Sequence, residues 1–219
     1  MVTLATKCYV AGDARGRAMD GMNSLVNNTV GELDVDAAVS VRDDDFVEVD
    51  LSGPDETVSA NLLREEWGAI ASAGHPDHTV GTLESWDDDG FVFDSGDQIR
   101  LPAEELGLGP GTPDQIVERF GLVQHLPMQF QPGNTPELTE AERDRLYEWQ
   151  RGAGRVNVNS ATRGEVRATV NRAGHASDIV TVERLGLLEQ SIVCREGTDP
   201  PGLLAAIGSY LPAQMRCVV

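Results

Sequence analysis

Five arginines lie close together between residues 151 and 175, where the only acidic side chain is Glu165. A guanidinium group matches two oxygens of a phosphate, while asparagine amides can bind sugar edges. The cluster can therefore dock an anion. We expect six side chains of this region to contact the phosphates and sugar edges of a nucleic acid: Arg155, Asn157, Asn159, Arg163, Arg167 and Arg172.

Part of this cluster has helical spacing. Arg163, Arg167 and Asn171 are four residues apart, so on a helix they form one row beside the apolar stripe of Val166 and Val170. Free backbone amides at the start of such a helix would bind the same anion. RNA backbone is the ligand class that fits. The alternative is that the arginines pair with acidic neighbouring domains and only hold the domains together.

The charge of the chain is divided unevenly. The whole protein of 219 residues has 36 acidic and 17 basic side chains, a net charge of −19, which excludes a generally basic nucleic-acid coat. Residues 1–136 hold 25 acidic and 7 basic side chains, net −18, whereas residues 137–219 hold 11 and 10, net −1. The last third therefore lacks the excess of acidic residues found in the rest of the chain. We expect a partner outside the molecule to bind its arginines.

Lys7 is the only lysine, and the other 16 basic residues are arginines. At molar salt the Debye length is about 3 Å, so a carboxylate-covered surface no longer repels itself. Acidity with so little lysine predicts a salt-loaded cytoplasm, as in haloarchaea; the alternative is a mesophilic acidic protein. Neither an apolar run of membrane-spanning length nor a signal-peptide pattern is found, so we expect a cytoplasmic protein without membrane contact.

Motifs for catalysis or metal binding are weak. The segment His75–His78 offers two metal ligands, but no third or fourth follows at recognisable spacing. Asp87–Gly90 resembles part of a calcium loop, yet Ser85 and Gly96 stand where that pattern requires acids. The three cysteines are far apart. We therefore expect no enzyme, no cofactor and no bound metal.

The first 75 residues alternate strand and helix patterns in the order βαββα. Residues 52–55 have the form of a capping box before the second helix. The segment after Gly74 could supply the last strand of this sheet, or it could pair with the sheet of the next domain. The other expected elements are a strand near 3–10, a helix carrying Met19 to Leu33, and a hairpin of strands 35–41 and 46–51.

The last third repeats this order and completes it. Strands are expected at 155–158, 178–184, 188–195 and 214–219, with one helix after residues 159–162 and a second opened by Asp199 and Pro200. This βαββαβ order is the ferredoxin-like arrangement, a four-stranded antiparallel sheet with two helices on one face. A connecting helix over 137–151, capped by Thr139 and Glu142, precedes it.

Helix patterns are scarce between 76 and 136, where Gly81–Gly96 resembles the opening of the S1 RNA-binding domain, a five-stranded OB-type barrel. Leu101–Leu106 matches the helical turn after the third strand of that family. Where S1 domains present stacking aromatics, this chain has Asp89 and Val92, and where they often carry a histidine it has Pro102. The resemblance implies the barrel fold. The three departures from the S1 pattern disfavour RNA binding through that face of the barrel.

Two further resemblances concern the C-terminal third. Residues 155–160 and 182–190 resemble an uncharacterised archaeal family that is common in haloarchaea. Residues 191–207 look like the strand, turn and helix of ACT domains, which bind amino acids. That resemblance implies an amino-acid-responsive regulatory protein sensitive at Asp199 and Gly202; a simple helix cap is the alternative.

Together these patterns predict an α+β protein of three domains: a ferredoxin-like domain at 1–75, an S1-like barrel at 76–136, and a linker helix with a second ferredoxin-like domain at 137–219. We expect a non-catalytic RNA- or ribonucleoprotein-binding factor associated with translation or transcription. With aromatic residues at 5%, structured RNA fits better than naked single strands. A factor of this kind is expected to associate with the ribosome or with RNA polymerase.

Overall fold

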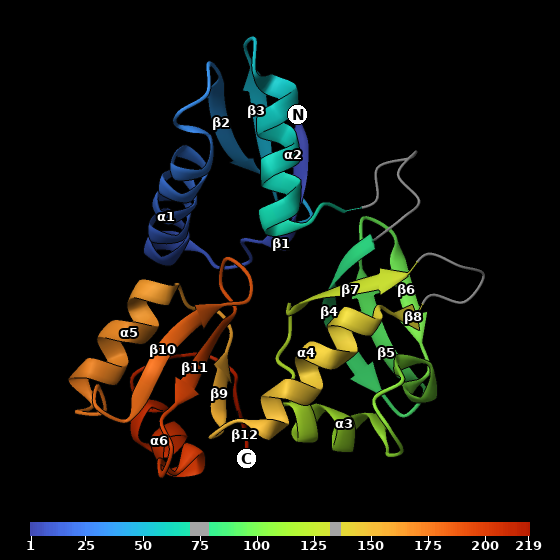
Figure 1. The fold of residues 1–219 in the computed structure, drawn as a ribbon, viewed down its shortest axis with the longest axis vertical. Helices are drawn as coiled ribbons and strands as arrows, with labels where there is room; N and C mark the ends of the chain where they lie inside the picture. Colours follow the sequence, from blue (N-terminus) through green and yellow to red (C-terminus); the bar gives the residue numbers. More distant parts are fainter. Residues whose placement is uncertain (71–78, 132–136) are drawn as a thin grey trace.

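The computed structural model describes residues 1–70, 79–131 and 137–219. Helices and strands form three parts, each with its own antiparallel sheet (Figure 1). The α+β class predicted from the sequence is therefore confirmed. We name the parts the N-terminal domain (1–70), the middle domain (79–131 with 137–151) and the C-terminal domain (152–219).

The N-terminal domain has the predicted βαββα order, with strand order β1-β3-β2. Met22, Val26 and Val30 recur along one side of the first helix and are buried against the sheet. Its elements are β1 (Val2–Lys7), α1 (Gly12–Val30), β2 (Asp36–Val41), β3 (Phe46–Ser52) and α2 (Glu56–Trp67).

Two details of this domain differ from expectation. The carboxylate of Asp55 makes no capping bond to α2 and instead accepts a hydrogen bond from the Asp34 amide at 2.9 Å. An isolated bridge between Leu4 and Ala69 adds a short pairing beside β1. It lies earlier in the chain than the last strand expected after Gly74, and residues 71–78 are outside the described part.

The sheet of the middle domain is curled into a half-barrel with strand order β6-β5-β4-β7-β8. Phe93 and Phe130 meet edge to face in its core, with ring centroids 4.7 Å apart. Its elements are β4 (Thr79–Asp87), β5 (Gly90–Asp94), β6 (Gln98–Leu101), the 3-10 helix η1 (Ala103–Leu106), α3 (Pro113–Phe120), β7 (Pro127–Gln131), β8 (Glu137–Leu138) and α4 (Glu140–Arg151).

Helix α4 packs on the middle domain. Leu146 and Trp149 are buried in the same core as the half-barrel phenylalanines. Thr139 caps the helix, because its hydroxyl accepts the Glu142 amide at 3.1 Å. The other half of the predicted capping box is absent, because the Glu142 carboxylate accepts from Arg145 and the Thr139 amide donates to the Gln129 carbonyl. The helix that the sequence assigned to a linker is thus part of the middle domain's core.

The C-terminal domain has the predicted βαββαβ order and strand order β10-β11-β9-β12, all antiparallel. Val156 and Val158 of the central strand β9 face the two helices and are fully buried. Its elements are β9 (Arg155–Val158), α5 (Arg163–Arg172), β10 (Ile179–Arg184), β11 (Gln190–Cys194), α6 (Pro200–Ile207) and β12 (Met215–Val218).

The turn between β10 and β11 reaches the place where all three domains meet (Figure 1). Leu187 and Leu188 from this turn are buried in the core of the N-terminal domain, and Leu185 packs on the core of the middle domain. The three domains therefore form one packed block through this turn. No helix in the described part of the chain is long and apolar enough to cross a membrane.

Candidate functional site

The arginine-bearing helix α5 begins with a capping box. The Thr162 hydroxyl accepts the Glu165 amide at 3.3 Å, and the Glu165 carboxylate accepts the Thr162 amide at 2.9 Å. Glu165 also pairs with Arg17 of α1 at 2.8 Å. Two amides expected to hold an external anion are therefore engaged, and any anion at α5 must be bound mainly by side chains.

The C-terminal sheet separates the six predicted site residues into two groups. Val156 and Val158 point toward α5 and α6, so Arg155 and Asn157 point to the opposite face of the sheet. Arg163, Arg167 and Arg172 are on α5, on the helical side. The structure therefore does not bring the six side chains onto one surface as the sequence predicted.

Arg155 is held inside the protein. Its guanidinium donates to Glu183 at 3.0 Å and to Ser191 at 3.1 Å, and lies over the Trp149 ring at 5.0 Å. Burial lowers the pKa of Arg155, opposed by the charge of Glu183. The stacked guanidinium joins the C-terminal domain to α4, which is the interdomain role that the sequence analysis gave as the alternative to a phosphate contact.

Asn157 and Asn159 also connect domains. Asn157 is 0% exposed and donates to the Gly121 carbonyl at 2.8 Å. Asn159 is buried and donates to the Gln124 carbonyl at 3.2 Å. Both acceptors belong to the middle domain, so these amides hold the two domains together, and the expected sugar-edge role does not fit their burial.

The three α5 arginines remain at the surface. Arg167 and Arg172 are exposed, while Arg163 is half-buried and donates through Nε to the Val182 carbonyl at 2.6 Å. Among the described residues, none of the three forms an ion pair with a carboxylate. Arg163 and Arg167 share one side of the helix, whereas Arg172 lies about 140° around it from Arg167 at 100° per residue.

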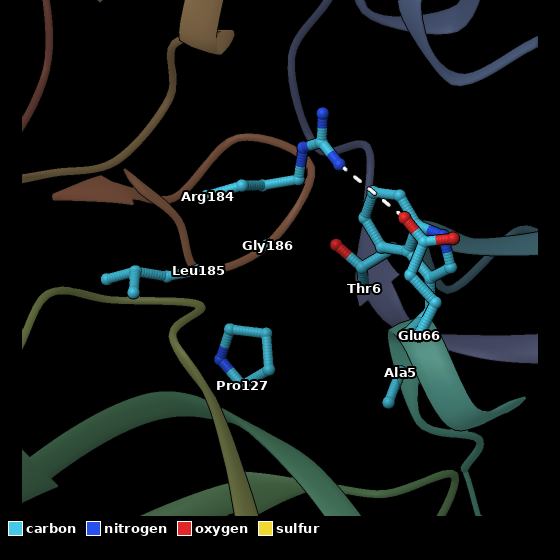
Figure 2. Close-up of a pocket in the computed structure, with 8 residues that line it drawn as sticks. Ala5, Thr6, Glu66, Pro127, Arg184, Leu185 and Gly186 are labelled. Carbon is cyan, nitrogen blue, oxygen red and sulfur yellow. Dashed lines mark ion pairs between the residues drawn. The ribbon is translucent and has the colours of Figure 1, made fainter. Parts of the chain in front are cut away.

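A cavity of about 210 Å³ lies where the three domains meet, lined by residues of all three. Figure 2 shows Arg184 reaching across it toward Glu66, with Pro127 and Leu185 on another side. The Arg184 guanidinium is 3.7 Å from the Glu66 carboxylate and 5.3 Å from the centroid of the Trp67 ring. Sequence patterns gave no sign of this site, because its walls come from residues far apart in the chain.

Burial lowers the pKa of Arg184, the Glu66 carboxylate raises it, and the charge of Arg163 lowers it further. Arg184 is a cationic side chain that sequence reasoning did not single out.

Lys7, the only lysine, is buried between two domains. It is 6% exposed and its ammonium contacts Glu84 at 3.0 Å and Asp94 at 2.7 Å, both in the middle domain. It also lies 4.6 Å from the centroid of the Phe46 ring. Burial acts to lower the pKa of Lys7, but hydrogen bonds to Asp94 and Glu84 outweigh it and raise the pKa. The chain thus has lysine only where it is hidden from solvent.

The sheet face compared with S1 domains carries no aromatic pair at the two aligned positions. Asp89 is exposed in the turn after β4 and lies 3.5 Å from Arg100, while Val92 is buried. Pro102 precedes the 3-10 helix as its N-cap. These positions offer an ion pair and a turn, with no stacking platform for bases.

Asp199 and Gly202, the positions singled out by the ACT resemblance, line an open hollow of about 520 Å³. The Asp199 carboxylate accepts the Gly202 amide at 3.1 Å and so caps α6. The histidines at 75 and 78 lie outside the described residues. Within the described ranges, no group of three metal-ligating side chains of the His, Cys, Asp or Glu type is found.

Three family models match consecutive parts of the chain: the DUF2110 N-terminal domain over residues 1–73, the DUF2110 central domain over 74–150, and the DUF2110 C-terminal domain over 153–219. The chain belongs to the DUF2110 family. No curated protein and no solved structure matches it. The DUF2110 central domain includes α4, in agreement with the packing of Leu146 and Trp149 on the half-barrel core.

Proposed function

We propose that this protein is a non-catalytic binding factor for RNA or a ribonucleoprotein surface, and that its contact surface is the exposed side of α5. One observation carries the proposal. Arg163 and Arg167 share one side of α5 in a domain of nearly balanced charge, and neither pairs with a carboxylate of the described residues; Arg172 is exposed on another side of the helix. Unpaired arginines on an otherwise acidic protein are suited to phosphate groups.

The proposal is narrower than the six residues predicted from sequence. Arg155, Asn157 and Asn159 support it indirectly, because they fix the C-terminal domain to the middle domain. A rigid block presents one fixed arrangement of cations, which favours a structured RNA of matching shape over a flexible strand. Ribosomal RNA and RNA polymerase complexes are partners of this kind.

We also infer the finer fold assignments and the cellular setting. Strand order β10-β11-β9-β12 is that of a ferredoxin-like domain, and the bridge at Ala69 supports the same reading for the N-terminal domain. The order β6-β5-β4-β7-β8, with β8 beside η1, supports an OB-like barrel. An acidic surface with its single lysine buried supports a salt-rich archaeal cytoplasm.

The test is retention of total cellular RNA on a filter at molar KCl. We expect the wild-type protein to retain RNA and the double variant Arg163→Glu with Arg167→Glu to lose most of it. Arg42→Glu with Arg64→Glu is the matched control, because it makes the same charge change on the N-terminal domain. Since Arg163 also binds the Val182 carbonyl, the exposed single variant Arg167→Glu separates charge from folding. Equal retention by all variants would exclude the proposal.

A small-molecule regulatory role is the second candidate, favoured by the hollow at Asp199 and Gly202. Arg195, Asp178 and His175 also line it, so it offers both charges to a zwitterion such as an amino acid. A thermal shift with an amino acid that is lost in Arg195→Gln would support this role. If no amino acid changes the melting temperature of the wild-type protein, the regulatory role is excluded.

A further inference from the structure

Strand β2 of the N-terminal domain has a free edge, with no strand partner there in the described part of the chain. The sheet has the order β1-β3-β2, so β2 bonds to β3 on one side only. The opposite edge, β1, faces the middle domain, where Lys7 binds Glu84. Figure 1 shows β2 on the outer side of the sheet, away from the middle domain.

The backbone of β2 presents unpaired hydrogen-bonding groups at this edge. The Arg42 amide donates to the Phe46 carbonyl at 2.9 Å, so the even-numbered residues of the strand bond to β3. The N–H and C=O groups of Ala37, Val39 and Val41 therefore point outward. No hydrogen bond to these groups is found within the described ranges.

Other strand edges of the protein are protected. Residues 68–70 bond to β1, the Arg163 guanidinium covers the Val182 carbonyl on β10, and β12 packs against α3. Edge strands usually carry a charge, a proline or a bulge that prevents pairing with another chain. Residues 37–41 have no charge and no proline, and their register with β3 is unbroken. An edge of this kind favours the addition of another strand.

The side chains along this edge are incompletely covered. Ala37, Val39 and Val41 pack against the core on the helix side of the sheet, yet each is only partly buried. Ala38 and Ser40 on the opposite face are exposed. A strand placed beside β2 would extend the sheet and cover the partly exposed valines.

We propose that β2 pairs with β2 of a second copy of this chain, antiparallel and with Val39 opposite Val39. In this register Ala37 of each copy lies opposite Val41 of the other. The outward N–H and C=O groups of all three residues then bond to one another across the contact. Because each copy offers the same surface, the contact closes as a two-fold dimer.

Charge selects this register. Asp36 lies opposite Arg42 of the other copy at both ends of the paired strands. Arg42 also binds Asp44 of its own chain at 2.9 Å, so each guanidinium would contact two carboxylates. A shift by two residues sets Asp36 opposite Asp44 in one direction. In the other direction it sets Val41 opposite Val35, whose amide is already bound within its own turn.

The arrangement of the domains and the effect of salt agree with this contact. The turn after β2 binds the Cys8 amide, and the next residue, Tyr9, contacts both other domains. Two-fold symmetry therefore places the other domains of the two copies on opposite sides of the contact. Each copy has a net charge of −19. Molar salt, with a Debye length of about 3 Å, screens their repulsion and leaves backbone hydrogen bonds and apolar contacts in place.

The first test is sedimentation of the full-length protein at molar KCl over a series of concentrations. We expect the wild type to form a dimer as its concentration rises. Val39→Pro should stay monomeric, because proline removes an outward N–H without removing a hydrogen bond to β3. Val39→Ile keeps the amide and an apolar side chain, and should dimerise like the wild type. A wild-type monomer at every concentration, or a dimer of folded Val39→Pro, overturns the inference.

The second test fixes the register and needs no proline. Ala38 of one copy lies opposite Ser40 of the other in a non-hydrogen-bonded pair, where Cα atoms are about 4.5 Å apart, a separation that suits a disulfide. A mixture of Ala38→Cys and Ser40→Cys proteins should therefore form a linked dimer under mild oxidation. The control mixture is Ala38→Cys with Ser52→Cys, because Ser52 is also exposed but lies on β3, one strand inside the sheet.

Peptide mapping by mass spectrometry identifies the linked positions. It separates a link between positions 38 and 40 from any link to Cys217, the native cysteine that is partly exposed. A link between 38 and 40 that is absent from the control mixture supports the inference. No such link, or equal linking in the control mixture, overturns it. Neither test depends on the proposed RNA function, because β2 and α5 lie on different domains.

Discussion

Tyr9 donates a 2.6 Å hydrogen bond to the fully buried carboxyl of Glu189, which lies 180 residues later in the chain. The same hydroxyl accepts the Ser160 amide at 2.9 Å, and the Tyr9 ring packs on His125 with centroids 3.8 Å apart. Tyr9 therefore contacts both other domains. Burial raises the pKa of Tyr9, so the phenol stays protonated as the donor.

The Glu189 carboxyl should make stability depend on pH. Burial raises its pKa from 4.5 to about 8, even though the Tyr9 hydrogen bond lowers it. Between those values the folded protein keeps a proton that the unfolded chain has released, so stability falls as pH rises, by up to about 1.4 kcal/mol per pH unit. Glu189→Gln should flatten the melting temperature between pH 5 and 8, and raise it most at pH 8.

Glu196→Gln, on the surface, is the control for this pH series. It should follow the wild-type curve, because Glu196 is exposed. Parallel pH dependence in wild type and Glu189→Gln would show that Glu189 is ionised when folded, contrary to the burial argument.

Lys7→Met should be strongly destabilising. It leaves Glu84 and Asp94 without the ammonium that they share, and removing one partner of a buried ion pair typically costs about 3 kcal/mol or more. Urea unfolding at fixed ionic strength measures the loss. The exposed pair of Arg42 and Asp44 supplies the control: Arg42→Met should cost less than about 1 kcal/mol. Similar small losses for both variants would contradict the account.

The same burial predicts slow chemical modification. Lys7 carries the only side-chain amine in the protein and is 6% exposed. An amine-reactive reagent should label the N-terminal amine quickly and Lys7 only after denaturant is added. Intact-mass measurement counts the labels. Two labels appearing at equal rates in native buffer would show that the ion pair opens readily.

Asn157→Ala should lower stability, whereas Arg167→Ala should lower RNA retention. Asn157 is fully buried and binds the Gly121 carbonyl, so its loss leaves that acceptor unpaired and costs about 1–3 kcal/mol. Arg167 is exposed, so Arg167→Ala should leave the melting temperature nearly unchanged but weaken RNA retention. Thermal unfolding and filter retention are measured on both. Loss of RNA retention in a stable Asn157→Ala protein would restore the wider surface first predicted.

Local sequence patterns were enough to predict most of the elements. The strand at 155–158 has the predicted bounds, and Asp199 caps α6 through the Gly202 amide. Helix α3 was missed although its start is visible in the sequence, as Thr112 and Gln115 form a capping box around Pro113. The frequent turns nearby obscured it.

The division of the arginine cluster was also partly visible. Val156 and Val158 alternate with Arg155 and Asn157, so the two pairs must face opposite sides of the sheet. Helix α5 covers the valine side, which separates Arg155 and Asn157 from the α5 arginines. What no local pattern reveals is that the other side of the sheet is covered by the middle domain.

Long-range polar contacts could not be predicted. Lys7 meets Glu84 and Asp94 across 77 and 87 residues, and Arg184 meets Glu66 between two domains. Periodicity places side chains on a face, but it does not say which face of another domain lies against it. The junction cavity is therefore a property of the three domains packed together.

The most direct test of the account is ultraviolet crosslinking of the wild-type protein to RNA at molar KCl, with mass spectrometry of the linked peptides. The account predicts crosslinks in α5, over residues 163–172, and their loss in Arg163→Glu with Arg167→Glu. Crosslinks confined to the half-barrel strands over residues 82–101, or no crosslinks above background, would contradict it.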